Sequence, residues 1–250
     1  MITVMKKYFL LTLVLILSFG CSDIGHDHDH DHGHDHGKKE SPKVFSDDNE
    51  YLTNLNLMKG HLWVGFELYK SNYTENAKKH MKHPKSELYG EIVPTFEEKG
   101  LKGFAKELES LAISVENEET IAKVEENYQN LFTAINENED FVDQESKTIS
   151  KKILLVTSLL DIAAEEYAIG IVNGEVKNKF EYQDALGFTT MAKNILNSIQ
   201  TENESEKQKV SSIISTVEKL SVLWPELVPT DKVEGDAKTI VAAIEEIKKI

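Results

Sequence analysis

Apolar residues recur at intervals of three and four from about position 46 to the end of the chain, the spacing of helices that bury one face. Strict alternation of apolar and polar residues, expected of half-buried strands, is absent, and glycine is sparse. The pattern predicts an all-α fold, an antiparallel helical bundle. The expected helices are residues 46–71, 73–83, 86–99 with an interruption at Pro94, 101–115, 118–136, 146–172, 178–200, 204–222 and 235–250.

Short segments of turn-forming residues separate these helices. "VNGEVKN" at 172–178 indicates a turn between two long helices, "HP" ends a helix at His83, and "WPELVPTD" at 224–231 carries two prolines. The helices fall into halves, with a possible boundary near 137–146. The sequence allows one larger bundle or two packed small ones.

The first residues resemble an export signal. Lys6 and Lys7 precede the apolar run "YFLLTLVLILSF", which is short for a membrane span, so residues 1–20 are predicted to be a signal peptide. Cys21 follows directly and is the only cysteine, which excludes an intrachain disulfide. "LSFGC" resembles the lipobox of bacterial lipoproteins, although Phe19 is bulky where a small residue is usual. The resemblance implies lipidation of Cys21 and an extracytoplasmic, membrane-anchored protein in the periplasm or at the cell surface. The alternative is a secreted protein with a free thiol.

Residues 21–45 have almost no apolar content and are predicted to be a disordered linker. Within them "GHDHDHDHGHDHG" holds six of the nine histidines of the chain. Such a tract binds zinc, nickel or copper with modest affinity and low selectivity, because ordering the chain costs entropy. A solubilising spacer is the other interpretation. The weak candidate ligands are His26, His28, His30, His32, His34 and His36.

The charge balance narrows the partners. The chain has 43 acidic and 28 basic residues and a formal net charge of -15 at pH 7. Because phosphate binding requires clustered basic charge, nucleic acid is excluded as an expected partner, and cations are favoured.

The other three histidines lie close together in the sequence. His61 falls in the middle of the apolar side of the helix at 46–71, and Gly65, one turn later, leaves space beside it. His80 and His83 are an i, i+3 pair that can point two imidazoles at one ion, and Glu87 offers a carboxylate just after them. Either these residues form a metal site, or one is a core histidine and two face solvent.

Acids occupy apolar faces in the second half. Glu166 lies in the apolar face of helix 146–172, and Glu181 and Asp184 lie in that of helix 178–200. An antiparallel hairpin places Glu166 and Asp184 at about the same height. Because a buried carboxylate is costly unless paired, protonated or bound to a cation, we expect either a hard-cation site or a protonated hydrogen-bond network. These two faces carry no histidine, so tyrosine hydroxyls such as Tyr167 are the expected neutral partners.

"AAEEYAIGIVNGEVKNKFEYQDALGF", residues 163–188, resembles a segment of the extracytoplasmic helical domain that precedes the membrane part of some bacterial high-affinity iron permeases. The shared features are an acid-Tyr pair, a glycine-containing turn, a Glu-Tyr pair and a following acid. The later "LWPELVP" is similar to a Trp-Pro stretch of such domains. The resemblance covers about residues 150–250 and implies metal traffic, with the acids at 166–184 as carriers.

Together these features predict an extracytoplasmic lipoprotein that binds a transition metal for uptake or homeostasis, with zinc expected first and iron (Fe2+ or Fe3+) or copper next. We expect no enzyme, because no nucleophile triad, phosphate loop or zinc-protease motif occurs. The expected partners are metal ions, the membrane through lipidated Cys21, and a metal transporter. The alternative is a helical accessory lipoprotein that docks on a membrane transporter and whose buried acids are structural.

Overall fold

The computed structural model describes residues 44–250, apart from the side chains of Ser86 and Glu87. The expected signal peptide, Cys21 and the histidine tract therefore lie outside the described residues. No helix within the described range is long and apolar enough to span a membrane.

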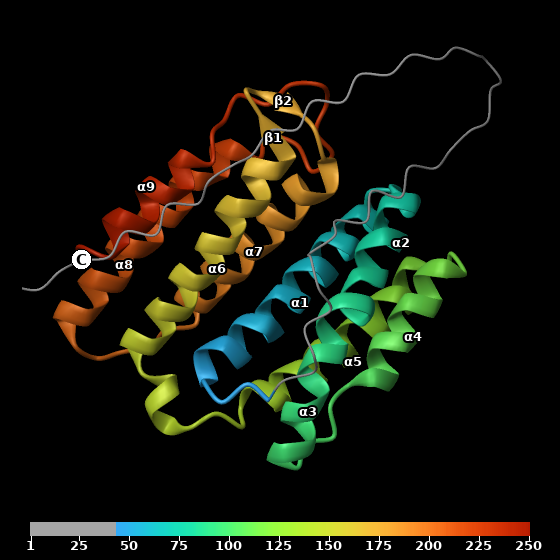
Figure 1. The fold of residues 1–250 in the computed structure, drawn as a ribbon, viewed down its shortest axis with the longest axis horizontal. Helices are drawn as coiled ribbons and strands as arrows, with labels where there is room; N and C mark the ends of the chain where they lie inside the picture. The colour runs from blue at the N-terminus through green and yellow to red at the C-terminus, as the bar shows by residue number, and fades with distance from the viewer. Residues whose placement is uncertain (1–43) are drawn as a thin grey trace, which may run out of the picture. The chain divides into compact units, whose positions relative to one another are not determined.

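The described residues form one compact helical unit, so the all-α prediction is confirmed (Figure 1). The exception is a short antiparallel hairpin whose two strands are each two residues long. The elements are α1 (Asp48–Lys70), α2 (Thr74–His83), the π-helical turn η1 (Pro84–Tyr89), α3 (Gly90–Lys99), α4 (Ala105–Glu116), α5 (Ile121–Glu139), the 3-10 turn η2 (Gln144–Lys147), α6 (Ile149–Gly170), β1 (Ile171–Val172), β2 (Glu175–Val176), α7 (Lys179–Asn197), α8 (Glu204–Glu218), the 3-10 turn η3 (Lys219–Leu223) and α9 (Lys238–Ile247).

Two apolar cores lie inside this unit. The buried side chains of α6 to α9 form a C-terminal core, and those of α1 to α5 form an N-terminal core. Leu52 and Trp63 of α1 pack against both cores. In Figure 1 α1 lies between the α6 and α7 pair and the helices α2 to α5, and it contacts α2, α5, α6 and α7. The structure is thus one unit with two apolar cores, and α1 joins its halves.

The turn between α6 and α7 has a local cause. Asn173 and Gly174 both have positive φ, 53° and 78°, as the two central residues of a tight hairpin turn require. Asn178 is the N-cap of α7, and its Oδ1 accepts a hydrogen bond of 3.0 Å from the backbone N–H of Phe180. The hairpin returns α7 along α6, so the acids of both helices lie in one interior.

The predicted interruption at Pro94 does not occur. Pro94 lies inside α3, where its missing N–H removes one helical hydrogen bond without ending the helix. The neighbouring Ile92, Thr95 and Phe96 are buried, and this packing holds α3 together. At His83, by contrast, α2 ends as predicted, although the chain continues into η1.

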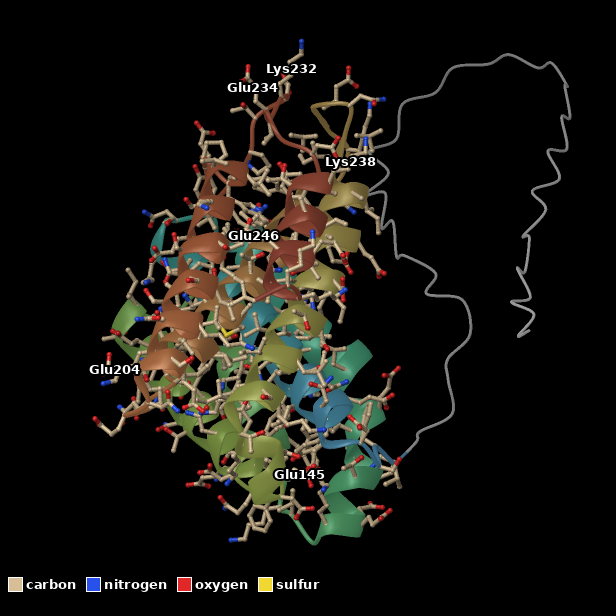
Figure 2. The ribbon with its side chains drawn as sticks, turned by 90° about the vertical axis from the view of Figure 1, so that its left-hand side faces the viewer. Glu145, Glu204, Lys232, Glu234, Lys238 and Glu246 are labelled. Carbon is tan, nitrogen blue, oxygen red and sulfur yellow. The ribbon has the colours of Figure 1, made fainter. Side chains whose placement is uncertain are left out.

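The outer faces of the C-terminal helices are charged. Figure 2 shows Glu204 at the start of α8 and Glu246 on α9, both exposed, with Lys232 and Glu234 at the end of the molecule near the hairpin. The inner faces of the same helices supply the C-terminal core. This division leaves the interior carboxylates of α6 and α7 as the unusual feature.

Candidate metal centre

The site lies where α1 crosses α7, and two glycines allow the close approach. A Cβ added to Gly187 would lie 2.5 Å from the backbone oxygen of Gly60, and one added to Gly60 would lie 2.6 Å from the ring of Phe188. The helices therefore touch through their backbones. One residue beyond Gly60, His61 reaches α7, and its Nδ1 lies 2.6 Å from Oδ1 of Asp184.

A third glycine places α2 against α1. A Cβ on Gly65 would lie 2.9 Å from Cε of Met81 and 3.2 Å from Cβ of His80. The space expected beside Gly65 therefore exists, and the side chains of α2 fill it. His80 is 1% exposed, and its Nδ1 lies 3.0 Å from the Asp184 oxygen that also contacts His61.

His83, the last residue of α2, completes a group of three candidate ligands. One ligand atom each from His61, His83 and Asp184 lies within 4.8 Å of the others. The rings of His61 and His83 have centroids 5.9 Å apart. We call these three residues and His80 the His–Asp cluster. Protein–metal bonds to nitrogen and oxygen are about 2.0–2.2 Å long, so small side-chain movements suffice to close this group on one ion.

Electrostatics at Asp184 favour a charged carboxylate. Burial alone would raise its pKa, but the charges of His61 and His80 and their hydrogen bonds outweigh burial, and the pKa is held well below its usual value. Asp184 is therefore an anion in the interior at neutral pH, as a metal ligand must be.

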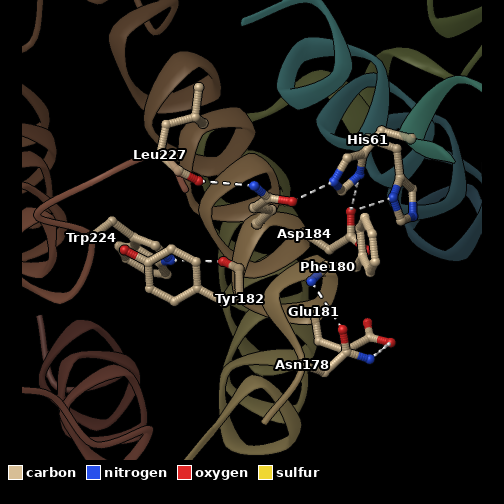
Figure 3. A network of polar contacts seen from close by, with 10 residues as sticks. His61, Asn178, Phe180, Glu181, Tyr182, Asp184, Trp224 and Leu227 are labelled. Carbon is tan, nitrogen blue, oxygen red and sulfur yellow. Dashed lines mark hydrogen bonds and ion pairs between the residues drawn. The ribbon is translucent and has the colours of Figure 1, made fainter. Parts of the chain in front are cut away.

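A further network lies behind His80 (Figure 3). Nε2 of His80 lies 2.9 Å from Oε1 of Gln183, and Nε2 of Gln183 donates a 3.0 Å hydrogen bond to the backbone oxygen of Leu227. The site is thus linked to the segment 224–228 that follows η3. Phe188 packs edge-on against His61, with ring centroids 5.0 Å apart, and forms an apolar wall.

Glu166 and Glu181 form a separate pair, which we call the glutamate pair. Glu166 hydrogen bonds Glu181, and burial, that bond and the Glu181 charge raise the pKa of Glu166 to about 9. Oε2 of Glu166 is buried without a hydrogen-bond partner, and Asn178 donates to Oε1 of Glu181 at 3.3 Å. Of the two interpretations left open for the inward acids, a protonated network describes the glutamate pair, whereas Asp184 is an ionised partner of histidines.

One expectation about the surroundings of the acids is wrong. Tyr167 is not their partner, because its hydroxyl donates to the backbone oxygen of Leu223. The faces of α6 and α7 carry no histidine, but α1 and α2 supply His61 and His80 to Asp184 across the interface. The Glu87 side chain and the histidine tract lie outside the described part of the chain.

Gln183 was not among the sequence candidates. It is fully buried, and the only signal for it is its position directly before Asp184. On a helix with one buried face, successive residues point in different directions and one of them meets solvent. Here Tyr182, Gln183 and Asp184 are all buried, because α6, α1, α8 and the segment 224–228 surround α7.

Comparison with known proteins found a family match for the second half of the molecule. Residues 142–250 match the model of the iron permease-associated 4-helix bundle domain. The matched part holds α6, α7, α8 and α9, and the predicted resemblance to the helical domain of iron permeases is confirmed. The match links the protein to iron permease-related function. Asp184 and the glutamate pair lie inside the matched region, and His61, His80 and His83 lie before it. No curated protein and no solved structure gave a significant match to the chain.

Proposed function

We propose that this protein binds a divalent first-row transition metal at His61, His83 and Asp184 and serves metal uptake or homeostasis beside an iron permease. The observation that carries the proposal is the convergence of two imidazoles and an ionised carboxylate, from α1, α2 and α7, within 4.8 Å of one another. An interior carboxylate that is charged and faces ring nitrogens is the electrostatic setting of a cation site.

Ferrous iron is the proposed cargo. Two histidines and one carboxylate are a ligand set used for Fe2+, and also for Zn2+. What supports iron over zinc is the match of residues 142–250 to an iron permease-associated domain. Zinc, favoured in the sequence by the histidine tract, is the competitor against which the selectivity of the site is to be measured.

The proposed location is outside the cytoplasm, with a lipid anchor on Cys21. The support is the sequence of residues 1–21, with its basic start, apolar run and cysteine. In this arrangement the histidine tract collects metal weakly near the membrane and the His–Asp cluster selects it. Labelling of cells with a radioactive fatty acid tests the anchor: label is expected on the wild type and not on Cys21→Ala, and an unlabelled wild type contradicts it.

Binding rather than catalysis is the proposed role. The titratable groups at the site are the proposed ligands themselves and His80, and none stands apart as a general base. The rival is an accessory protein that docks on a transporter and holds no metal. Both are compatible with the matched domain, so metal binding decides between them.

Calorimetric titration of the full-length chain tests the proposal, with the tract silenced so that its sites do not contribute. We expect one equivalent of anaerobic Fe2+ to bind more tightly than micromolar, and Asp184→Asn to abolish binding. Glu166→Gln is the matched control, since it alters the other buried acid and should bind normally. If the parent does not bind one equivalent of metal, the proposal is wrong and the accessory protein that docks on a transporter is favoured. The parent carries alanine at His26, His28, His30, His32, His34 and His36.

A further inference from the structure

We propose that Gln183 is a positioning residue of this metal site, which holds the His80 ring so that Nδ1 of His80 becomes a fourth protein ligand. This inference rests on the proposed function. It follows from the direction in which each polar group between Leu227 and Asp184 donates (Figure 3).

The Gln183 side chain has only one possible orientation. Its Nε2 lies 3.0 Å from the backbone oxygen of Leu227, and a carbonyl oxygen only accepts hydrogen bonds. The amide nitrogen must therefore face Leu227, and Oε1 must face His80. Gln183 is 0% exposed, so water does not compete for either end.

This orientation fixes the proton on His80. An amide oxygen only accepts, so Nε2 of His80, 2.9 Å from Oε1 of Gln183, must be the donor. Nε2 therefore keeps its proton, and Nδ1 is the nitrogen that faces Asp184. Nδ1 is buried and lies 3.0 Å from Oδ1 of Asp184, the oxygen that also contacts His61. A metal ion that takes the place of the Nδ1 proton, which is released to solvent, would join this nitrogen to the Asp184 oxygen.

The tether behind Gln183 is itself held in place. The hydroxyl of Tyr182 donates to the backbone oxygen of Glu226 at 2.8 Å, and Nε1 of Trp224 donates to the backbone oxygen of Tyr182 at 2.9 Å. The segment 224–228 is thus bound to α7 at Tyr182, through two residues that precede Leu227. Gln183 is oriented by bonds that do not depend on the metal, so the His80 ring is prepared before an ion arrives.

The magnitude follows from other metal sites. A ligating histidine usually donates its second N–H to an oxygen, and loss of that partner costs about 10–100-fold in metal affinity. Gln183→Leu removes the acceptor and the donor and puts a shorter, apolar side chain in their place. Gln183→Glu keeps an oxygen facing His80 and loses the donor to Leu227.

Zinc titrations in the tract-silenced full-length parent test this inference, since zinc is redox-inert. We expect Gln183→Leu to weaken binding about 10–100-fold, and Gln183→Glu to restore it to within a few-fold of the parent. The matched control is Glu166→Gln, which alters a buried acid of the neighbouring α6 outside the His–Asp cluster and should bind like the parent. Parental affinity in Gln183→Leu, or equal weakening in Leu and Glu variants, overturns the role of Gln183.

A second measurement does not require any variant to fold. In parent protein labelled with 15N-histidine, zinc should move the Nδ1 resonance of His80 to a metal-bound position while Nε2 keeps its proton. A His80 ring that zinc leaves unchanged, in a parent that binds zinc, overturns the fourth ligand and leaves the site of His61, His83 and Asp184 standing. A parent that does not bind metal instead refutes the proposed function.

Discussion

Asp184 and Glu166 are inward-facing carboxyls of one helical hairpin, yet their environments drive them to opposite protonation states. The pKa of Asp184 is lowered by His61 and His80, and the pKa of Glu166 is raised to about 9 by burial and by Glu181. The difference lies in the element that each acid faces. Asp184 meets α1 and α2, which bring imidazoles, whereas Glu166 meets a second acid of α7. Burial alone therefore does not identify a cation site; the partner across the interface does.

The largest expected effect is on metal affinity. Asp184→Asn removes the anionic ligand, so it should cost more than the ~10–100-fold typical of losing an outer hydrogen-bond partner. Glu166→Gln should change affinity by less than about threefold. Titration of both variants with Fe2+ measures the contrast. Equal losses in the two variants would mean that both acids belong to one site and would remove the distinction between them.

The helix crossing gives the next largest effect. Gly187→Ala forces a Cβ against the backbone of Gly60, so it should destabilise the fold by about 1–3 kcal/mol and weaken metal binding by separating His61 from Asp184. Denaturant unfolding measures the first change and calorimetry the second. Gly90→Ala is the control, because a Cβ there meets nothing within 4 Å. A Gly187→Ala protein as stable as the parent would show that the crossing is not tight.

The glutamate pair predicts a pH dependence in the neutral and alkaline range. A folded pKa above the unfolded value means that the folded state binds the extra proton, so its stabilising effect is full below about pH 4.5 and is lost as the pH rises toward 9. Glu166→Gln keeps a neutral donor. Between pH 5 and 9 the free energy of unfolding of this variant should decrease by about 1–2 kcal/mol less than that of the parent. This difference includes a reduction for partial solvent screening. Chemical unfolding at several pH values measures this, and parallel curves would contradict it.

Asp184 predicts the opposite slope at acid pH. Its folded pKa is below the unfolded value, so its contribution is present above about pH 4 and is lost as the pH falls further. In the metal-free protein, the free energy of unfolding should fall less steeply below pH 4 in Asp184→Asn than in the parent. The difference is expected to be the smallest of the four, since other carboxyls titrate in the same range. If the free energy of unfolding fell equally steeply with pH in both proteins, the ion pairs of Asp184 with His61 and His80 would not stabilise the fold.

The helices were largely predictable because each is encoded locally. The spacing of apolar residues predicted the helices, and the segment 172–178 with its Asn-Gly pair predicted the turn between α6 and α7. Gly65, one turn after His61, predicted space beside that histidine. The meeting of His61 with Asp184 was not predictable, because 123 residues separate them and the contact depends on how α1 docks on α7. Gln183 was hidden for the same reason, since its burial comes from the segment 224–228 rather than from its own helix.

The contact between Gly60 and Gly187 also bears on the geometry of the proposed site. Where two main chains touch, the helices cannot come closer, and any added side chain would push them apart. The spacing between α1 and α7 at the proposed site is therefore governed by the two helical backbones, while donor chemistry rests with the imidazoles and the carboxylate. Replacing a donor residue would change the chemistry of the site and leave this backbone spacing in place.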